Sequence, residues 1–489
     1  MPRPSLLCHE CRKTYNLEGE DYACVSCGQP LLITYDPEDL KEAFDRRRPL
    51  EPEYGVWRFR RTLPFPTHVE PTSLGEGDTY LTRCERLERL LGLKALYIKN
   101  ESTNPTGSFI DRGSTILVTH AKQKRRSTIV FASTGNLGSS LAAYAAKAGI
   151  KCRIYIPYRV DLGKLYQMIA YGAEVKPVKS INEALEKIPG GRSELDYMVT
   201  KNNPYPLEGY KTIFYEVVEQ LKNSPPDRVI VPMGSGGLIT ALWKGMVEME
   251  EAGHLSGKPM LTGVQENLCD PIVKAYQGLE PLRQPAEEAP LALDLYVSQP
   301  TYVRTALKAI KESKGTATSI SDKDIVEAAS LVARTEGIFA ESAAASTIAG
   351  LRKLLEEGLI ERSETVVCVV TGEGLKDPSM AMRIVKKERT LSKMILRMNS
   401  KVSRFGETKV AILSVLNREN LHGYGIWGEL KKRFKIRITP SGVYQHLTEL
   451  EMAGMLKKCR VERLEGKPER IYYTLTEKGK KALIELTRP

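Results

Sequence analysis

The stretch Glu101-Ser102-Thr103-Asn104-Pro105-Thr106-Gly107-Ser108-Phe109 directly follows a short apolar run near the start of a long repetitive region. From about residue 70 onward, β-branched runs alternate with segments of helical character. This βαβα rhythm is typical of a mostly parallel sheet that is covered by helices on both faces. We therefore expect an α/β domain over residues 36–380. The expected strands are Ala95–Ile98, Thr128–Ala132, Cys152–Ile156, Arg228–Val231, Met260–Val264 and Thr365–Val370, and the clearest helices are Gly138–Ala148 and Asp324–Glu336.

Three more polar loops follow strands of this region. They are Ser133-Thr134-Gly135-Asn136, Met233-Gly234-Ser235-Gly236-Gly237 and Thr371-Gly372-Glu373-Gly374. Sheets of this kind bind ligands at the carboxyl ends of their strands. A glycine-rich turn that enters a helix offers backbone N–H groups and a positive dipole end to a phosphate. One such loop is weak support, but four in this order predict a binding site for a phosphate-bearing ligand.

From Thr72-Ser73-Leu74-Gly75-Glu76-Gly77 to Gly374-Leu375-Lys376-Asp377-Pro378, the chain resembles threonine synthase and its pyridoxal-phosphate relatives of the tryptophan-synthase β-subunit fold type. The resemblance implies open parallel sheets and a pyridoxal phosphate site. By position, it implies that Asn136 contacts the cofactor's ring oxygen, that Gly234, Ser235, Gly236 and Gly237 hold its phosphate, that Thr371 faces its pyridine nitrogen, and that Ser133, Thr134 and Gly135 bind a substrate carboxylate.

The chain departs from the family at one decisive position. The family motif reads Asn-Pro-Thr-Gly-Ser-Phe-Lys-Asp-Arg, and this chain has Ile110 where the motif has lysine. That lysine forms the Schiff base and moves the protons, whereas isoleucine has neither a nucleophile nor a titratable proton. Lys99 matches a separate family position and is a poor substitute. Smaller departures are Asp78 and Tyr80 near the first loop. Another is Ser342, at a position where the family usually has proline.

Three explanations of Ile110 stay open. Catalysis has been lost naturally while the pocket is retained, the lysine has been engineered away or miscopied, or another lysine replaces it. We favour the first. The third is the least favoured, because Schiff-base geometry is demanding. No catalytic residue is then expected, and pyridoxal phosphate would bind without a covalent bond. The remaining alternative is a relic of the fold that binds nothing.

Four cysteines at the amino-terminal end form two Cys-x-x-Cys pairs. Cys8 and Cys11 are separated by twelve residues from Cys24 and Cys27, and Gly28 follows the second pair. Two such pairs can hold one tetrahedral ion, so residues 1–35 predict a structural zinc ribbon. The ribbon also resembles the start of archaeal-type threonine synthases. Two unrelated reduced pairs are the alternative, and His9 is expected to be exposed rather than a ligand.

Positive charge is concentrated in the last part of the chain. Between Ala381 and Pro489 there are 25 Lys and Arg against 11 Asp and Glu, and because the whole chain carries +12, residues 1–380 carry about −2. This balance predicts a nucleic-acid or other anionic partner at that end, although a solvated basic face would give the same charge. We expect a linker over residues 381–400, formed by a helix from Met380 to Met398, and a DNA-binding domain over residues 401–489.

The pattern of the last domain predicts a winged helix-turn-helix. Helices are expected around Ala411–Leu416, from His422 to near Arg433, and from Thr439-Pro440 to Leu450, followed by a basic hairpin and a last helix. The motifs His-Gly-Tyr, Tyr-x-x-Leu-x-x-Leu, Gly-Lys-Pro and Tyr-x-Leu-Thr-x-x-Gly resemble PadR-type transcription regulators. The third helix would enter the major groove. The expected DNA-facing residues are Ser441, Tyr444, Gln445 and His446 on this helix and Lys467 and Arg470 in the wing, with Tyr444 open to a core role and Lys431, Lys432 and Arg433 each more typical of solvated charges.

Two classes of function stand beside each other at this point. One is a ligand-responsive transcription regulator, a pseudoenzyme sensor for an amino-acid or phosphorylated effector. The other is a threonine-synthase-type lyase, converting O-phosphohomoserine to threonine, with an autoregulatory DNA-binding domain; a DNA-binding scaffold with a dead pocket is a third. Little chain follows the wing helix, so we expect the large domain to supply a homodimer. The chain has no apolar run of about 20 residues and no signal-type start, so we expect it in the cytoplasm.

Overall fold

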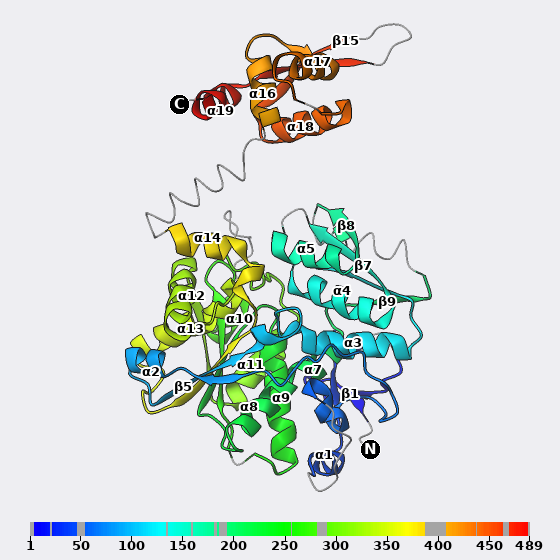
Figure 1. Ribbon diagram of the computed structural model, residues 1–489. Helices are drawn as coiled ribbons and strands as arrows, with labels where there is room; N and C mark the ends of the chain where they lie inside the picture. Colours follow the sequence, from blue (N-terminus) through cyan, green and yellow to red (C-terminus); the bar gives the residue numbers. More distant parts are fainter. Residues whose placement is uncertain are drawn as a thin grey trace. The chain divides into compact units, whose positions relative to one another are not determined.

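The computed structural model describes residues 4–19, 22–45, 54–133, 135–157, 160–179, 183–184, 193–255, 257–280, 291–386, 407–436, 438–462 and 469–487. The chain divides into two compact units, Met1–Ile384 and Val385–Pro489. Figure 1 shows the first unit in blue to yellow and the second in orange to red. Within the described residues, no helix combines the length and the apolar character needed to cross a membrane.

The larger sheet of the first unit has six strands in the order β12-β11-β10-β13-β5-β4. Five of them are parallel, and β4 pairs with β5 in the antiparallel sense at one edge. The parallel strands confirm the predicted α/β class, while the short edge strand β4 was not predicted. The strands are β4 (Leu81–Arg83), β5 (Ala95–Asn100), β10 (Arg228–Pro232), β11 (Met260–Glu266), β12 (Thr316–Ile320) and β13 (Thr365–Val370).

Helices bury both faces of this sheet. Along β13, Val366, Cys368 and Val370 join one apolar core, whereas Val367 and Val369 join the other. This alternation follows from the two-residue period of a strand, and burial on both faces explains the nearly continuous apolar run. The first core includes helices α2 (Glu85–Leu91), α12 (Asp322–Glu336) and α13 (Ser342–Glu356); the second includes α8 (Thr212–Gln220), α9 (Gly237–Glu251) and α11 (Val303–Glu312).

A second, four-stranded sheet is parallel throughout, in the order β8-β7-β6-β9. Its strands are β6 (Thr128–Ala132), β7 (Lys151–Pro157), β8 (Glu174–Val178) and β9 (Asp196–Met198). Helices α3 (Ile110–Gln123), α4 (Asn136–Ala148) and α5 (Leu162–Ala170) lie beside it in the upper part of the first unit in Figure 1. The two sheets give the first unit two layered halves, and the polar loops lie where their strands end.

The amino-terminal ribbon is a three-stranded antiparallel sheet, β1 (Ser5–Leu7), β2 (Thr14–Tyr15) and β3 (Leu32–Thr34). The ribbon packs against α9, one of the helices that cover the large sheet. The contact is made by His9, whose ring lies edge-on to that of Trp243 in α9 at 5.2 Å between centroids. The expectation of an exposed His9 is wrong, since this packing leaves it only partly exposed. The remaining elements of the unit are α1 (Pro37–Phe44), η1 (Gly55–Thr62), η2 (Glu101–Thr103), α7 (Tyr205–Tyr210), α10 (Pro271–Tyr276), η3 (Gly374–Lys376) and α14 (Pro378–Lys386).

Over its described residues, the second unit has four helices and a three-stranded sheet that includes a hairpin. Its helices are α16 (Glu407–Leu416), α17 (Gly423–Arg433), α18 (Pro440–Met452) and α19 (Glu477–Thr487), and its sheet has the order β14-β16-β15, with β14 (Leu421–His422), β15 (Leu456–Glu462) and β16 (Arg470–Leu475). Thr439 caps α18 by accepting from the Gly442 amide, with Pro440 in the first turn. The linker helix expected from Met380 onward corresponds to α14 up to Lys386, and its remainder lies outside the described residues.

Candidate functional site

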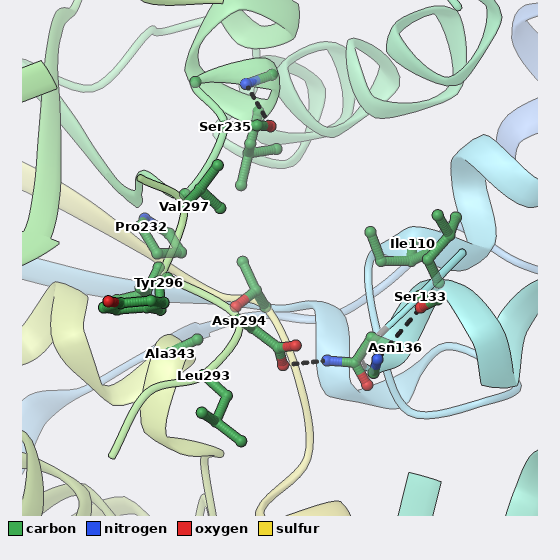
Figure 2. A pocket seen from close by; sticks show the side chains of 18 of the residues that line it. Ile110, Ser133, Asn136, Pro232, Ser235, Leu293, Asp294, Tyr296, Val297 and Ala343 are labelled. Atoms are coloured by element: carbon green, nitrogen blue, oxygen red, sulfur yellow. Dashed lines mark hydrogen bonds between the residues drawn. The ribbon is translucent and has the colours of Figure 1, made fainter. Parts of the chain in front are cut away.

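A cavity of about 660 Å³ opens at the carboxyl ends of the strands of the first unit. The residues that the sequence pointed to converge on it from separate loops. Phe109 and Ile110 come from the start of α3, Asn136 from the start of α4, and Thr371 from the end of β13. The lining residues named earlier as site candidates are Ile110, Ser133, Gly135, Asn136, Gly234, Ser235, Gly236, Gly237 and Thr371. Figure 2 shows this cavity from close by.

The loop Gly234–Gly237 forms one end of the cavity. It leads directly into α9, a helix of 15 residues whose first turn leaves backbone N–H groups without helical partners. A side chain would fill the space here, because a Cβ at Gly234 would lie 2.8 Å from the Asp294 carbonyl oxygen. Gly236 has φ +83°, a conformation that favours glycine. The loop therefore fits a phosphate group, which needs close backbone approach and N–H donors.

Two acids, the buried Glu341 and the half-buried Asp294, meet Asn136 on another side of the cavity. The Asn136 side-chain amide donates to Asp294 at 3.1 Å and to both oxygens of Glu341 at 3.0 Å, and Figure 2 shows its contact with Asp294. Asp294 also pairs with the buried Lys164 at 2.5 Å, and Lys164 lies 3.7 Å from Glu341. Burial raises the pKa of Glu341 to about 7. This cluster makes the wall strongly polar.

One atom of this cluster has no partner. Among the described residues, nothing donates a hydrogen bond to the buried Asn136 Oδ1. The orientation of the amide follows from its neighbours, since the two carboxylates, when ionised, can only accept and so require the NH₂ group on their side. A buried acceptor without a donor is costly. It fits a ligand group that supplies a hydrogen, and together with the glycine loop it makes the cavity compatible with pyridoxal phosphate.

Ile110 begins α3 and lines the cavity near Ser133 and Asn136 (Figure 2). Its side chain brings no amine to this position. Lys99 is not among the lining residues and is fully buried in an ion pair with Glu216, at 2.6 Å. Lys376 is buried nearby, and its ammonium donates to the Thr106 carbonyl at 2.6 Å. Burial lowers the pKa of Lys376.

The loop proposed for a substrate carboxylate is organised by its own serine. Ser133 Oγ accepts from the backbone amides of Gly135 at 3.2 Å and Gly138 at 3.1 Å. Ser133 and Gly135 line the cavity, whereas Thr134 lies outside the described residues. The carbonyl of Thr371 accepts from the Phe109 amide at 2.9 Å, which joins the β13 loop to the start of α3.

Sequence reasoning missed three charged residues of the site. Asp294 and Glu341 are each the only acid in an apolar run, 291–295 and 338–341 respectively. A lone acid in such a run is a signal that could have identified both, because a buried carboxylate needs a partner or a function. Lys164 carries no comparable signal, since it sits on an otherwise ordinary amphipathic helix.

The four amino-terminal cysteines form one cluster. The Sγ atoms of Cys8, Cys11, Cys24 and Cys27 all lie within 4.8 Å of one another. Cys8 and Cys27 are 3.5 Å apart, and Cys11 and Cys24 are 3.9 Å apart. Zinc–sulfur bonds of about 2.3 Å in a tetrahedron place the sulfurs about 3.8 Å apart. The donor set and its spacing are compatible with zinc, and four thiolates leave no open position for catalysis.

In the second unit, α18 presents a polar face. Ser441, Tyr444 and Gln445 are exposed, with Tyr444 41% exposed. His446 is partly buried, and its ring lies 3.2 Å from Glu449 on the same helix. The alternative, a core role for Tyr444, holds in part, because the tyrosine ring packs against Gly423. Arg470 is exposed at the start of β16, and Lys467 lies outside the described residues.

Comparison with known proteins agrees with this geometry. A family of pyridoxal-phosphate-dependent enzymes matches residues 72–372, and the PadR-like family of transcriptional regulators matches residues 412–485. The tomato threonine deaminase isoform 2 has a similar structure, with a TM-score of 0.53 and 20% identity over 63% of this chain and 87% of that one. For diaminopropionate ammonia lyase from Escherichia coli the TM-score is 0.55, with 17% identity over 65% of this chain and 90% of that one. These two similarities support the fold alone.

The chain thus belongs to the pyridoxal-phosphate-dependent enzyme family. Within it, the first unit is homologous to threonine synthases, with 45% identity to the threonine synthase of Methanocaldococcus jannaschii over 383 residues, which are 77% of this chain and 94% of that protein. The threonine synthase of Halalkalibacterium halodurans is 39% identical over 67% of this chain and 90% of its own length. A threonine-synthase-like domain is therefore fused to a PadR domain.

Proposed function

We propose that this chain is a DNA-binding transcription regulator whose threonine-synthase-like unit senses a small ligand without catalysing the family's reaction. The observation that carries the proposal is Ile110 on the wall of the cavity. At this position the family motif has the lysine that bonds the cofactor and moves protons. An apolar side chain can do neither, while the surrounding phosphate loop and Asn136 retain the means to bind.

The ligand would bind by polar contacts alone. The Gly234–Gly237 loop would hold a phosphate, Asn136 a ring oxygen and Thr371 a ring nitrogen, with Ser133, Thr134 and Gly135 facing an attached carboxylate. The support for these roles is that all the described members of this set line one cavity. Pyridoxal phosphate, when bound, would supply an electron-withdrawing ring, but no residue at position 110 could exploit it. The zinc of the ribbon would be structural.

The second unit would bind duplex DNA. Helix α18 would enter the major groove with Ser441, Tyr444 and Gln445 on its exposed face, and His446 at its edge. Lys467 and Arg470 of the wing would contact phosphates. A palindromic site requires a two-fold protein, so we propose that the large unit forms a homodimer in the cytoplasm. A ligand would then act by favouring one arrangement of the two winged-helix domains of the dimer.

The test is a pair of measurements on the full-length protein. The first measures threonine formation from O-phosphohomoserine with added pyridoxal phosphate, and the second measures binding to a duplex recovered by this protein from a random-sequence pool. We expect no threonine above the level without protein, together with specific DNA binding. Robust threonine formation would overturn the proposal, and so would the absence of any selected duplex.

A second candidate, a threonine-synthase-type lyase that regulates its own gene, has one observation in its favour. Lys376 is buried beside the cavity, and burial lowers its pKa, which would make its amine more reactive. Its ammonium, however, donates to Thr106 O at 2.6 Å and would have to leave that contact. Turnover that disappears in Lys376→Met would establish this candidate.

A further inference from the structure

The cavity has two ends of opposite hydrogen-bonding character. At one end the backbone amides of the Gly234–Gly237 loop and the start of α9 are donors. Across from Ser235 in Figure 2 lie Asn136 and Asp294, and the carboxylate of Asp294 is an acceptor. A ligand that matches both ends needs an anion at one and a hydrogen-bond donor at the other.

The acceptor end carries more negative than positive charge. Asp161, Asp294 and Glu341 surround Lys164, whose ammonium is 3.3, 2.5 and 3.7 Å from them. Lys376, the other nearby cation, directs its ammonium to a backbone carbonyl. A buried carboxylate is stable only with a cation or several donors beside it. Glu341, 2% exposed, receives its hydrogen bonds from Asn136 Nδ2, a neutral group.

A second, independent feature points the same way. Asn136 is 7% exposed, lines the cavity, and has its Oδ1 unpaired among the described residues. An ionised carboxylate cannot satisfy that oxygen, and neither can a carbonyl. Ile110, which lines the cavity near it, has no polar hydrogen in its side chain. A ligand group with a polar hydrogen would supply the missing donor.

From these acceptors and the phosphate loop, we propose that the cavity selects a phosphate ester bearing a protonated primary amine, namely the amine form of the cofactor, pyridoxamine 5′-phosphate, over its aldehyde. The inference rests on the proposed function, in that it assigns the sensor's ligand to this same cavity. An ammonium offers three hydrogens, which suit Asn136 Oδ1, Asp294 and Glu341 together. An aldehyde oxygen only accepts, and without a lysine it has no covalent alternative.

The experiment is calorimetric titration of the full-length protein with pyridoxamine 5′-phosphate, pyridoxal 5′-phosphate, pyridoxine 5′-phosphate, pyridoxamine and O-phosphohomoserine. We expect the amine phosphate to bind at least about tenfold more tightly than the aldehyde and alcohol phosphates, which corresponds to one charge-assisted hydrogen bond. Pyridoxamine without phosphate should bind at least about a hundredfold more weakly. The preference for the amine should fall to less than about twofold in Glu341→Gln.

Two controls keep the result interpretable. Asp294→Asn, at a less buried carboxylate, should also reduce the preference, and it replaces Glu341→Gln if that variant does not fold. The acceptor cluster consists of Asn136, Asp294 and Glu341. Glu373→Gln changes a carboxylate outside this cluster and should keep the preference for the amine. Equal or tighter binding of the aldehyde, tighter binding of O-phosphohomoserine, an unchanged preference in both cluster variants, or no binding by any of these ligands would overturn the inference. None of these outcomes concerns DNA binding or turnover, so the proposed function fails separately.

Discussion

The side-chain amide of Asn136 donates to the carboxylate of Glu341 at 3.0 Å, across 205 positions of sequence. Asn136 begins α4, which covers the four-stranded sheet, and Glu341 immediately precedes α13, which covers the six-stranded one. The contact therefore joins the two halves of the first unit at the wall of the cavity. A ligand that contacts this pair contacts both halves at once, which is a physical basis for ligand-dependent change.

The first prediction concerns chemistry at position 110. The unmodified protein should hold pyridoxal phosphate without a covalent bond, because no amine lies at that position. Ile110→Lys should create covalent attachment, detected as a borohydride-fixed mass increase on the peptide that contains the new lysine. Ile110→Met, which has similar size and no amine, is the matched control and should show none. A fixed adduct in the unmodified protein, on any lysine, would contradict this prediction.

The second prediction concerns the metal. The purified protein should contain one zinc ion per chain, and Cys24→Ser should lose most of it, because a structural site needs all four thiolates. The natural control is Cys459→Ser, which removes an exposed cysteine of β15 outside the cluster. Elemental analysis of the three proteins gives the answer. Equal zinc content in the unmodified protein and in Cys24→Ser would show that the four cysteines do not hold the ion.

The third prediction concerns DNA. Affinity for duplex DNA should fall linearly in a double-logarithmic plot against salt, by about a hundredfold or more between about 50 and about 200 mM, because phosphate contacts release counterions. Gln445→Ala on the exposed face of α18 should cost about tenfold for the selected duplex. Met452→Ala, on an exposed side chain at the end of the same helix, should not. Residues 1–390 should not bind, and their retention of binding would show that the winged helix has another role.

The fourth prediction is a pH dependence. Burial raises the pKa of Glu341 to about 7, so its carboxylate is present above that pH and is protonated below it. Binding of pyridoxamine 5′-phosphate should therefore weaken from about pH 8 to about pH 6, as the carboxylate that holds the ammonium is lost. Asp294, Lys164 and Lys376 also act on this carboxylate and shift the midpoint, and Asp161 contacts Lys164.

Pyridoxine 5′-phosphate supplies the reference for this measurement, because its phosphate titrates in the same range but its alcohol group does not need the carboxylate. We divide the affinity for pyridoxamine 5′-phosphate by the affinity for pyridoxine 5′-phosphate. This ratio should decrease as the pH is lowered in the full-length protein and stay constant in Glu341→Gln. A ratio that rises as the pH falls would contradict the assignment of Glu341.

Much of the fold was predictable because it depends on local pattern. The buried strands Thr128–Ala132 and Thr365–Val370 appear with the predicted bounds, since short apolar runs between polar loops specify them. The glycine loops were predictable for the same reason. The edge strand β4 was missed because its three residues, of which two are exposed, carry no apolar alternation.

The acceptor cluster was not predictable from local pattern. Asn136 was singled out from its loop, but Asp294 and Glu341 reach it from positions more than 150 residues away. Such contacts depend on how the two sheets pack, which no window of sequence specifies. His9 was misread for a related reason, because the partner that covers it, Trp243, lies on a distant helix.

The fifth prediction tests the central claim, that the first unit senses a ligand on behalf of the second. The measurement is the affinity of the full-length protein for its selected duplex, determined by fluorescence anisotropy with and without saturating pyridoxamine 5′-phosphate. Coupling between two sites changes affinity by about fivefold or more in typical cases, so we expect a shift of that size in either direction. The same shift should be absent in Gly236→Val, whose side chain would enter the phosphate loop. An affinity for DNA that is identical with and without bound ligand would contradict the account.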